Sequence, residues 1–228
     1  MNLMKKNALG AIAVVLLLGA AAYAAFFIAP TDAKQGLIYR ILYLHVASAW
    51  TGLTAFFISF LANLLYVWRR QLRWDALGVS AAEVGLVFTT VVLVTGPIWA
   101  HPVWGIWWTW DARLTSTFVL WLLYVAYLLL RTLVEEPDRR ALLSALFGIF
   151  AFLDVPLVFG SIRWWRTQHP QPVVMGEPGS GLDPTMLKVL LFSWLSMLGL
   201  MTLLLWQRYR LEAMRGEFEI VRRQAEAS

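Results

Sequence analysis

The sequence contains no cysteine among its 228 residues, so a disulfide frame, thiolate metal sites and a cysteine nucleophile are all excluded. It has no G-x-x-x-x-G-K-[ST] phosphate-binding loop, which excludes ATP hydrolysis by that route. A Ser–His–Asp pattern in a soluble domain is also missing, so the chain shows no basis for hydrolytic chemistry. No hydrophobic run carries the ladder of acids or histidines that is expected in a proton-driven pump.

Charged residues are also scarce. They make up 14% of the chain, whereas about 25% is usual in soluble domains. Hydrophobic residues make up 60%, and the mean hydropathy is +0.64. This composition predicts an integral membrane protein. The formal net charge of +5 does not indicate nucleic-acid binding, because the positions of Lys and Arg in a membrane protein report its topology.

Six hydrophobic runs are candidates for membrane spans, each of which needs roughly 20 mostly apolar residues. They cover about residues 8–29, 41–68, 79–99, 116–130, 141–162 and 186–206. The first run exceeds the roughly 7–15 residues of a signal-peptide core, so we interpret it as an uncleaved helix. The sequence shows no internal repeat and no separate soluble domain. It predicts an all-α integral membrane protein, with one polytopic domain over 1–228, six transmembrane helices and a short amphipathic helix in the tail 207–228.

The distribution of positive charge predicts the orientation of these spans. Six spans place both termini on the same side of the membrane, and thirteen of the nineteen Lys and Arg residues fall on that side. Positive charge favours the cytoplasm. Both termini and the tail 207–228 are therefore expected to be cytoplasmic, and the segment between the third and fourth spans is expected at the outer face.

That segment, together with the end of the third span, is unusually rich in tryptophan. Residues 99–115 read WAHPVWGIWWTWDARLT, with five tryptophans within twelve positions. A transmembrane helix usually carries one or two tryptophans at an interface. So many flat aromatic faces, followed by Asp111 and Arg113, suit a large, flat, partly apolar ligand with charged edges. A loop that dips into the headgroup layer is the alternative interpretation. Asp111 is also expected to cap the fourth helix.

All three histidines are predicted at the outer side: His45 near the start of the second span, His101 in the tryptophan-rich segment and His169 in the last outer loop. A single histidine at a helix end is more often a hydrogen-bonded interfacial residue than a metal ligand. Two neutral imidazoles from separate segments, however, can ligate a haem iron from opposite faces. The histidines are therefore candidate iron ligands.

Cations on the outer side are candidate partners for the two propionates of a haem, because arginine bonds carboxylates bidentately. These cations are Lys34, Arg40, Arg113, Arg163 and Arg166. Two other interpretations remain open: the arginines could snorkel to headgroup phosphates, or Arg113 could pair with Asp111.

Two acids fall inside predicted spans, where ionisable residues are costly and often functional. Glu83 lies a few residues from the inner end and can reach water. Asp154 lies just before Pro156, nearer the outer half, and could line an outer cavity or bond a neighbouring helix. Pro156 is also expected to kink the fifth span.

The run 104–115 reads WGIWWTWDARLT and matches the pattern W-G-x-x-W-x-W-D at every fixed position. It resembles the WWD signature of a family of haem-handling membrane proteins. Within that family the chain is similar to the CcmC branch of cytochrome c maturation, also called haem exporter protein C, which is short and has six spans. His45 and His169 match the outward histidines that flank the signature there, and the similarity extends from about Gln35 to the sixth span. The larger relatives CcmF and CcsA have more spans and more histidines.

This resemblance implies a haem-loading protein of the bacterial inner membrane, with no ATPase of its own and no assigned enzymatic reaction. Haem b would be held transiently and non-covalently at the periplasmic face, with His45 and His169 as the axial iron ligands. The haem would then pass to the haem chaperone CcmE, while CcmA and CcmB, an ABC-type pair, and the small CcmD would associate with the chain. The implied haem and chaperone platform consists of Trp104, Gly105, Trp107, Trp108, Trp110, Asp111, Arg113 and Arg166.

Two other functions are also compatible with the residues. The chain could be a haem-independent membrane scaffold whose aromatic segment docks a partner protein. It could instead be a permease for another flat organic molecule, such as a quinone. A missing Soret band would favour the scaffold. Function that persists without haem and without the histidines would favour the permease.

Overall fold

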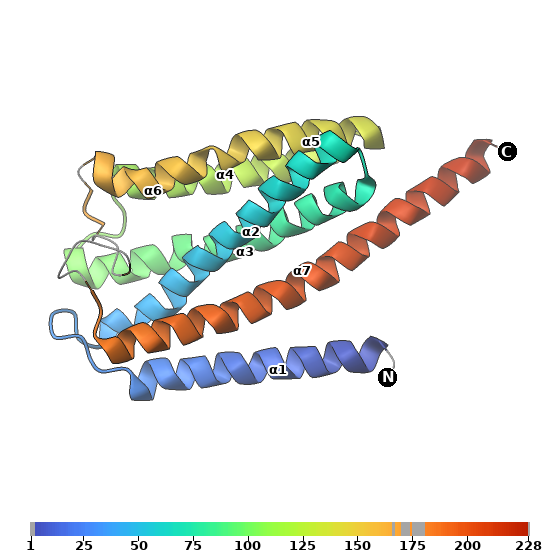
Figure 1. Ribbon diagram of the computed structural model, residues 1–228. Helices are drawn as coiled ribbons and strands as arrows, with labels where there is room; N and C mark the ends of the chain where they lie inside the picture. Colours follow the sequence, from blue (N-terminus) through green and yellow to red (C-terminus); the bar gives the residue numbers. More distant parts are fainter. Residues whose placement is uncertain (1–2, 166, 170–173, 175–180, 228) are drawn as a thin grey trace.

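Long helices make up nearly all of the computed structural model, which describes residues 3–165, 167–169, 174 and 181–227 (Figure 1). Within these ranges six helices are long and apolar enough to cross a membrane. They cover Asn7–Ile28, Leu37–Arg69, Leu72–Trp104, Ala112–Leu133, Pro137–Trp164 and Pro184–Glu219. The prediction of an all-helical chain with six membrane-spanning segments is confirmed, and the chain is a multi-pass membrane protein.

The elements are all helical. They are α1 (Leu3–Tyr23), the π-helical turn η1 (Ala24–Ile28), the 3₁₀ turn η2 (Leu37–Ile41), α2 (Leu42–Arg69), α3 (Leu72–Trp104), α4 (Ala112–Leu133), α5 (Pro137–Phe152), α6 (Asp154–Trp164) and α7 (Pro184–Ala227). Helices dominate because a backbone in hydrocarbon must satisfy its hydrogen bonds internally.

The third helix is longer than the predicted span 79–99. α3 continues through Pro97 and Pro102 to Trp104, and it ends where Gly105 adopts a positive φ of 75°. A proline inside a helix removes one backbone hydrogen bond, which neighbouring helices can tolerate in a membrane protein. Residues 99–104 of the tryptophan-rich segment are therefore part of α3, and 105–111 form the link to α4.

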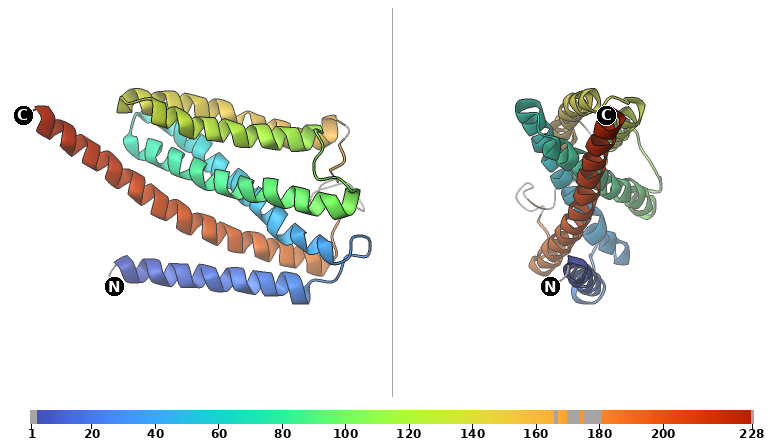
Figure 2. Two further views of the ribbon diagram at one scale, coloured as in Figure 1. Left: turned by 180° about the vertical axis from the view of Figure 1, so that it is seen from behind. Right: turned by 90° about the vertical axis from the view of Figure 1, so that its right-hand side faces the viewer.

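The sequence predicted a separate short helix in the tail 207–228, and this prediction is wrong. The sixth span and the tail form one continuous helix, α7, of 44 residues. Its C-terminal part extends past the other helices in Figures 1 and 2. The fifth span, in contrast, is interrupted as expected: α5 ends at Phe152 and α6 begins at Asp154. Pro156 has no N–H to bond the carbonyl of Phe152, so the helix breaks there.

α2 and α3 form the centre of the bundle, with α4, α5 and α6 on one side and α7 on the other (Figures 1 and 2). α1 is peripheral and packs mainly on α7. In the core the rings of Phe56 and Tyr124 stack with centroids 3.6 Å apart. Gly85 allows α3 to approach α2 closely, because a Cβ there would overlap the Phe56 ring.

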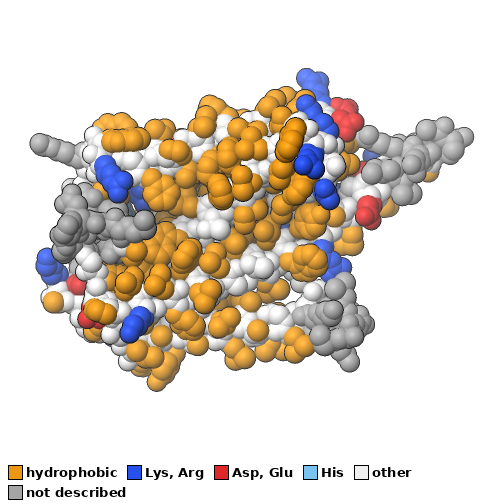
Figure 3. Space-filling view, viewed as in Figure 1, with side chains coloured by type: hydrophobic (Ala, Val, Ile, Leu, Met, Phe, Trp, Pro, Cys, Tyr) orange, Lys and Arg blue, Asp and Glu red, His pale blue; other side chains and the backbone are white. Residues whose placement is uncertain are grey.

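The bundle has two chemically distinct ends and an apolar middle. Figure 3 shows hydrophobic side chains over the middle of one face and Lys and Arg gathered towards its ends, as expected for a surface that meets lipid. Both termini lie at one end, which we call the terminal end (Figure 1). The link 105–111, the 3₁₀ turn η2 and the C-terminal end of α6 at Trp164 lie at the other, which we call the tryptophan end.

Candidate functional site

His45 lies one turn inside α2 at the tryptophan end and packs against α3. Its Nδ1 atom is 2.9 Å from the hydroxyl oxygen of Thr95. The edge of its ring meets Trp99, with centroids 5.7 Å apart and planes at 78°. Gly96 leaves room for the ring, since a Cβ at that position would be only 3.4 Å from the His45 Cε1 atom. One face of α3 thus determines the orientation of this imidazole.

Trp99 itself is held by the segment that precedes α2. Its indole N–H donates to the side-chain oxygen of Gln35 over 2.7 Å. The ring of Tyr39 meets it edge-on with centroids 5.6 Å apart. The wall beside His45 is therefore built from three parts of the chain: α3, the η2 turn and the link before that turn.

Asp111 caps α4, as the sequence predicted. One carboxylate oxygen accepts hydrogen bonds from the backbone N–H groups of Arg113 and Leu114, over 2.9 and 3.1 Å. The other oxygen accepts from the hydroxyl of Thr109 over 2.8 Å. These bonds satisfy the first donors of α4 and fix the end of the tryptophan-rich link.

The same carboxylate also connects this link to the segment that carries His169. The hydroxyl of Thr167 hydrogen-bonds Asp111, and the Thr167 oxygen accepts the backbone N–H of His169 over 3.1 Å. Burial raises the pKa of Asp111, but the bonds from Leu114, Thr109, Thr167 and Arg113 outweigh it and lower the pKa below its usual value. Asp111 is thus an anion that holds two segments together.

The charges of His169 and Arg113 act on the His45 ring, although the three side chains come from different segments. The Arg113 guanidinium donates to the carbonyl of Val158 on α6. Among the described residues no ion pair within 4 Å joins the Arg113 guanidinium to Asp111, but the carboxylate charge of Asp111 acts on it, so Asp111 remains an alternative partner of Arg113.

The tryptophans of the link differ in their accessibility. Trp107 and Trp110 are 58% and 74% exposed, whereas Trp104 and Trp108 are half-buried. Trp108 meets Trp110 edge-on with centroids 5.7 Å apart, and its buried indole nitrogen has no hydrogen-bond partner among the described residues. The link therefore presents two exposed indoles on a support of packed aromatic rings.

His101 does not join the other two histidines. At about 100° per residue it lies roughly 240° around α3 from Thr95, on a face turned away from His45. It is exposed and stacks on Trp107, with centroids 4.2 Å apart and planes at 20°. Within residues 3–165, 167–169, 174 and 181–227, no three His, Asp or Glu side chains are grouped to hold a metal ion.

The other predicted cations are less informative. Lys34 and Arg163 are exposed, and Arg40 is half-buried with its Nε atom lacking a hydrogen-bond partner among the described residues. Arg166 lies outside the described residues. Sequence reasoning missed Thr95 and Thr167, which contact the predicted site residues His45 and His169, and Gln35, which contacts Trp99 beside them.

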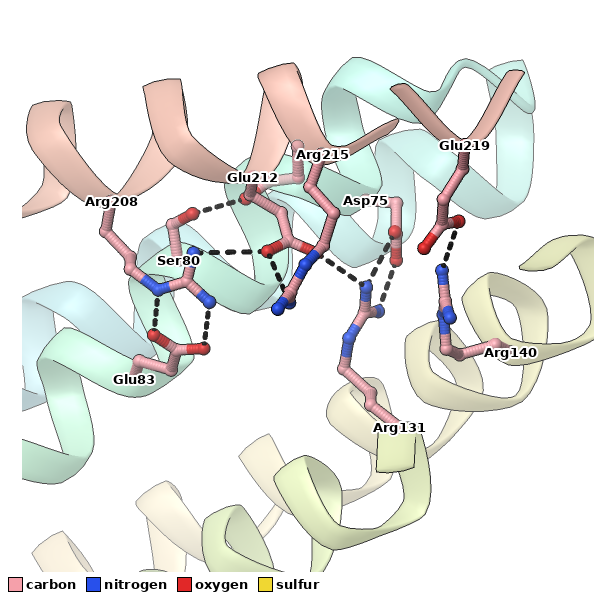
Figure 4. A network of polar contacts seen from close by, with 10 residues as sticks. Asp75, Ser80, Glu83, Arg131, Arg140, Arg208, Glu212, Arg215 and Glu219 are labelled. Carbon is pink, nitrogen blue, oxygen red and sulfur yellow. Dashed lines mark hydrogen bonds and ion pairs between the residues drawn. The ribbon is translucent and has the colours of Figure 1, made fainter. Parts of the chain in front are cut away.

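Of the two intramembrane acids, Glu83 belongs to the opposite end of the bundle (Figure 4). It forms an ion pair with Arg208 of α7, and Arg208 in turn lies 3.1 Å from Glu212. Asp154 is buried at the start of α6, and its Oδ2 atom has no partner among the residues that the structure describes. Neither acid is among the groups that the structure places at His45.

The network around Glu83 ties α7 to three other helices (Figure 4). Arg131 of α4 bonds both oxygens of Asp75 on α3, over 2.6 and 2.9 Å, and lies 3.7 Å from Glu212. Arg140 of α5 bonds Glu219 of α7 over 3.0 Å. These side chains line a groove of about 380 Å³ at the terminal end. Nearly every charged side chain of this network is in an ion pair, so its role is structural: it holds α7 against α3, α4 and α5.

The chain is similar to known proteins over most of its length. Residues 2–224 match the CcmC family, described as Heme exporter protein C. The chain is 36% identical over 208 residues to Heme exporter protein C of Bradyrhizobium diazoefficiens, which covers 91% of this chain and 76% of the relative. It is 36% identical over 202 residues to the Escherichia coli protein of the same name, with 88% and 80% covered. A ccmC-like mitochondrial protein of Arabidopsis thaliana, provisionally named for cytochrome c biosynthesis, is 32% identical over 184 residues, with 81% and 69% covered.

Proposed function

The chain belongs to the CcmC family of haem exporter proteins, which handle haem in cytochrome c maturation, and we propose that it binds haem between His45 and His169 and delivers it to the haem chaperone CcmE. Binding takes place at the tryptophan end, which faces the periplasm. The chain resides in the bacterial inner membrane with both termini in the cytoplasm, as the distribution of Lys and Arg predicts.

The observations that carry this proposal are the fixed imidazole of His45 at the tryptophan end, the action of the His169 and Arg113 charges on it, and the exposed indoles of the link. Two histidines without a third metal-binding side chain are a poor site for a bare ion. They suit haem, because the porphyrin supplies four nitrogen ligands and leaves two axial positions for imidazoles. The residues present therefore fit this cargo.

Each residue has a separate role in the proposed complex. His45 and His169 are the axial iron ligands. Arg113 bonds a propionate, because its guanidinium is close enough for its charge to be felt at His45 and it suits carboxylates. Arg166, outside the described residues, is the second predicted cation. The cargo is haem b, bound non-covalently and transiently, so that it can leave again.

Delivery uses the exposed side of the link. Trp107 and Trp110 offer accessible indoles to the haem edge and to the chaperone, supported by Trp104, Trp108 and the capping residue Asp111. Since the chain has no ATPase motif, ATP hydrolysis belongs to the ABC-type pair CcmA and CcmB, with CcmD as a further associate.

The test is the visible absorption spectrum of the full-length protein purified from haem-replete cells, beside His45→Ala, His169→Ala and His101→Ala. We expect a Soret band in the parent that weakens several-fold in the first two variants. His101→Ala is the matched control and keeps the band, because His101 stacks on Trp107 away from His45.

Two outcomes would contradict the proposal. If only His101→Ala loses the band, the protein handles haem but the ligand pair is wrong. If the parent has no Soret band with or without the chaperone, haem binding itself is wrong and the aromatic link is a protein-docking surface.

A further inference from the structure

The hydrogen bonds of Thr95 determine which nitrogen of His45 carries the proton. The Thr95 hydroxyl oxygen lies 2.7 Å from the carbonyl oxygen of Val91, 3.4 Å from that of Val92 and 2.9 Å from His45 Nδ1. A hydroxyl has one hydrogen, and a backbone carbonyl can only accept. The Thr95 hydrogen is therefore directed at the carbonyls, chiefly that of Val91. The remaining contact needs a hydrogen from His45, so its Nδ1–H donates to the Thr95 oxygen.

A neutral imidazole that is protonated on Nδ1 has its lone pair on Nε2. Metal-binding histidines commonly donate their other ring N–H to a nearby acceptor, which fixes the tautomer and the orientation of the ring. The edge contact with Trp99 restricts the same ring from a further side. His45 is thus held with one nitrogen occupied and the other available before any ligand arrives.

We propose that Thr95 is a positioning residue that fixes the Nδ1–H tautomer and the ring orientation of His45, so that Nε2 is the nitrogen that ligates haem iron. This inference rests on the proposed haem function. Thr95 suits the task because a helical threonine readily bonds the carbonyl four residues earlier, which leaves its oxygen as an acceptor.

The neutral hydroxyl also suits a protein that releases its cargo. A carboxylate in the same place would form a charge-assisted bond and raise the basicity of His45 more strongly. A hydroxyl orients the ring with a weaker effect on the iron bond. The partner of His45 therefore combines orientation with moderate affinity.

The test compares Thr95→Val, Thr95→Ser and Thr89→Val in the full-length protein. Valine is nearly isosteric and removes the hydroxyl, and with it both the acceptor for His45 and the donor to the Val91 carbonyl, whereas serine keeps both. Thr89→Val is the matched control, because Thr89 makes the same bond to the carbonyl four residues earlier on α3, at 2.8 Å, without contacting a histidine. The probe is haem b itself, followed by titration and by the low-spin signature of the ferric protein in absorption and electron paramagnetic resonance.

We expect Thr95→Val to bind haem about tenfold more weakly, at the lower end of what loss of a ligand's hydrogen-bond partner costs, and to show a high-spin fraction. Thr95→Ser and Thr89→Val should keep the affinity and the low-spin signature of the parent. A role confined to helix packing would not change the spin state and would not be rescued by serine.

The inference is overturned if Thr95→Val keeps the parent's affinity and spin state while His45→Ala loses haem; the proposed function then stands without it. It is also overturned if Thr95→Ser loses haem affinity and the low-spin signature as Thr95→Val does. If His45→Ala keeps haem, or the parent binds none, the ligand assignment of the proposed function fails and the inference fails with it.

Discussion

Threonine side chains hold both candidate ligands. The Thr95 hydroxyl accepts from the ring of His45, and the Thr167 hydroxyl accepts from the backbone of His169 while bonding the carboxylate of Asp111. Asp111 thus has a second task besides capping α4, since it connects the tryptophan-rich link to the segment of the second histidine. At the residue scale, the candidate site depends on Thr95 and Thr167, outside the tryptophan-rich run 104–115, as much as on that run itself.

Gly105 has a geometric role at the end of α3. Its φ of 75° lies in the left-handed region, and its N–H bonds the carbonyl of His101 over 2.8 Å. A Cβ added there would meet nothing within 4 Å, so the surroundings do not exclude a side chain. The conformation of the backbone accounts for glycine at this position.

Gly105→Ala should therefore destabilise the protein by about 1 kcal/mol, because alanine is strained at positive φ. Gly199→Ala is the matched control: it lies inside α7, where an added Cβ would meet Val14 at an ordinary 3.8 Å, so alanine should be neutral or slightly stabilising. The measurement is thermal unfolding in detergent. Equal melting temperatures for the two variants would contradict the role of backbone conformation.

At the scale of elements, α7 is stabilised at its C-terminal part by charge pairing. Glu212 and Glu219 of α7 meet Arg131 of α4 and Arg140 of α5, and Arg208 of α7 meets Glu83 of α3 (Figure 4). These contacts give the charged face of the predicted tail a surface to pack on. The helix therefore continues from the sixth span without a break.

Arg131→Met should destabilise the protein by about 3–5 kcal/mol, because it leaves the buried carboxylate of Asp75 without its partner. Arg131 is only 8% exposed in its side chain, whereas Arg215, which also contacts Glu212, is 66% exposed. Arg215→Met should thus cost at most about 1 kcal/mol. Unfolding of both variants in detergent tests this. A similar loss in the two would show that burial of the Asp75 pair is not what stabilises this end.

At the scale of the whole molecule, the bundle has two ends that differ in chemistry. The tryptophan end carries both candidate ligands and the exposed indoles, and the terminal end carries the paired charges. Haem delivery in the periplasm requires the tryptophan end to face outwards. The distribution of Lys and Arg predicts the same orientation.

Because the chain has no cysteine, single substitutions provide unique labels for this orientation. Lys34→Cys at the tryptophan end should react with a membrane-impermeant maleimide in intact spheroplasts. Glu135→Cys, in the exposed link between α4 and α5, should react only after permeabilisation. The readout is the mass shift of the full-length protein. The reverse pattern would overturn the predicted topology and, with it, the periplasmic site.

The sequence by itself determined the number of spans and the cap at Asp111, and it offered His45, His101 and His169 as candidate ligands, of which the family resemblance selects His45 and His169. These depend on local properties: hydrophobic length, the preference of a carboxylate for helix N-termini, and residue types in a short pattern. It could not give the end of α3, because Pro97 and Pro102 usually stop a helix and here do not.

Only the tertiary structure decided the surroundings of each histidine. The three histidines are alike in the sequence, all at the predicted outer side, and the surroundings of His45 and His101 depend on how α2 and α3 are rotated within the bundle. Packing of α2 on α3 turns His45 towards Thr95 and Trp99, while the rotation of α3 turns His101 away to stack on Trp107. Rotation follows from side chains on several helices fitting together at once, a property that no single segment carries.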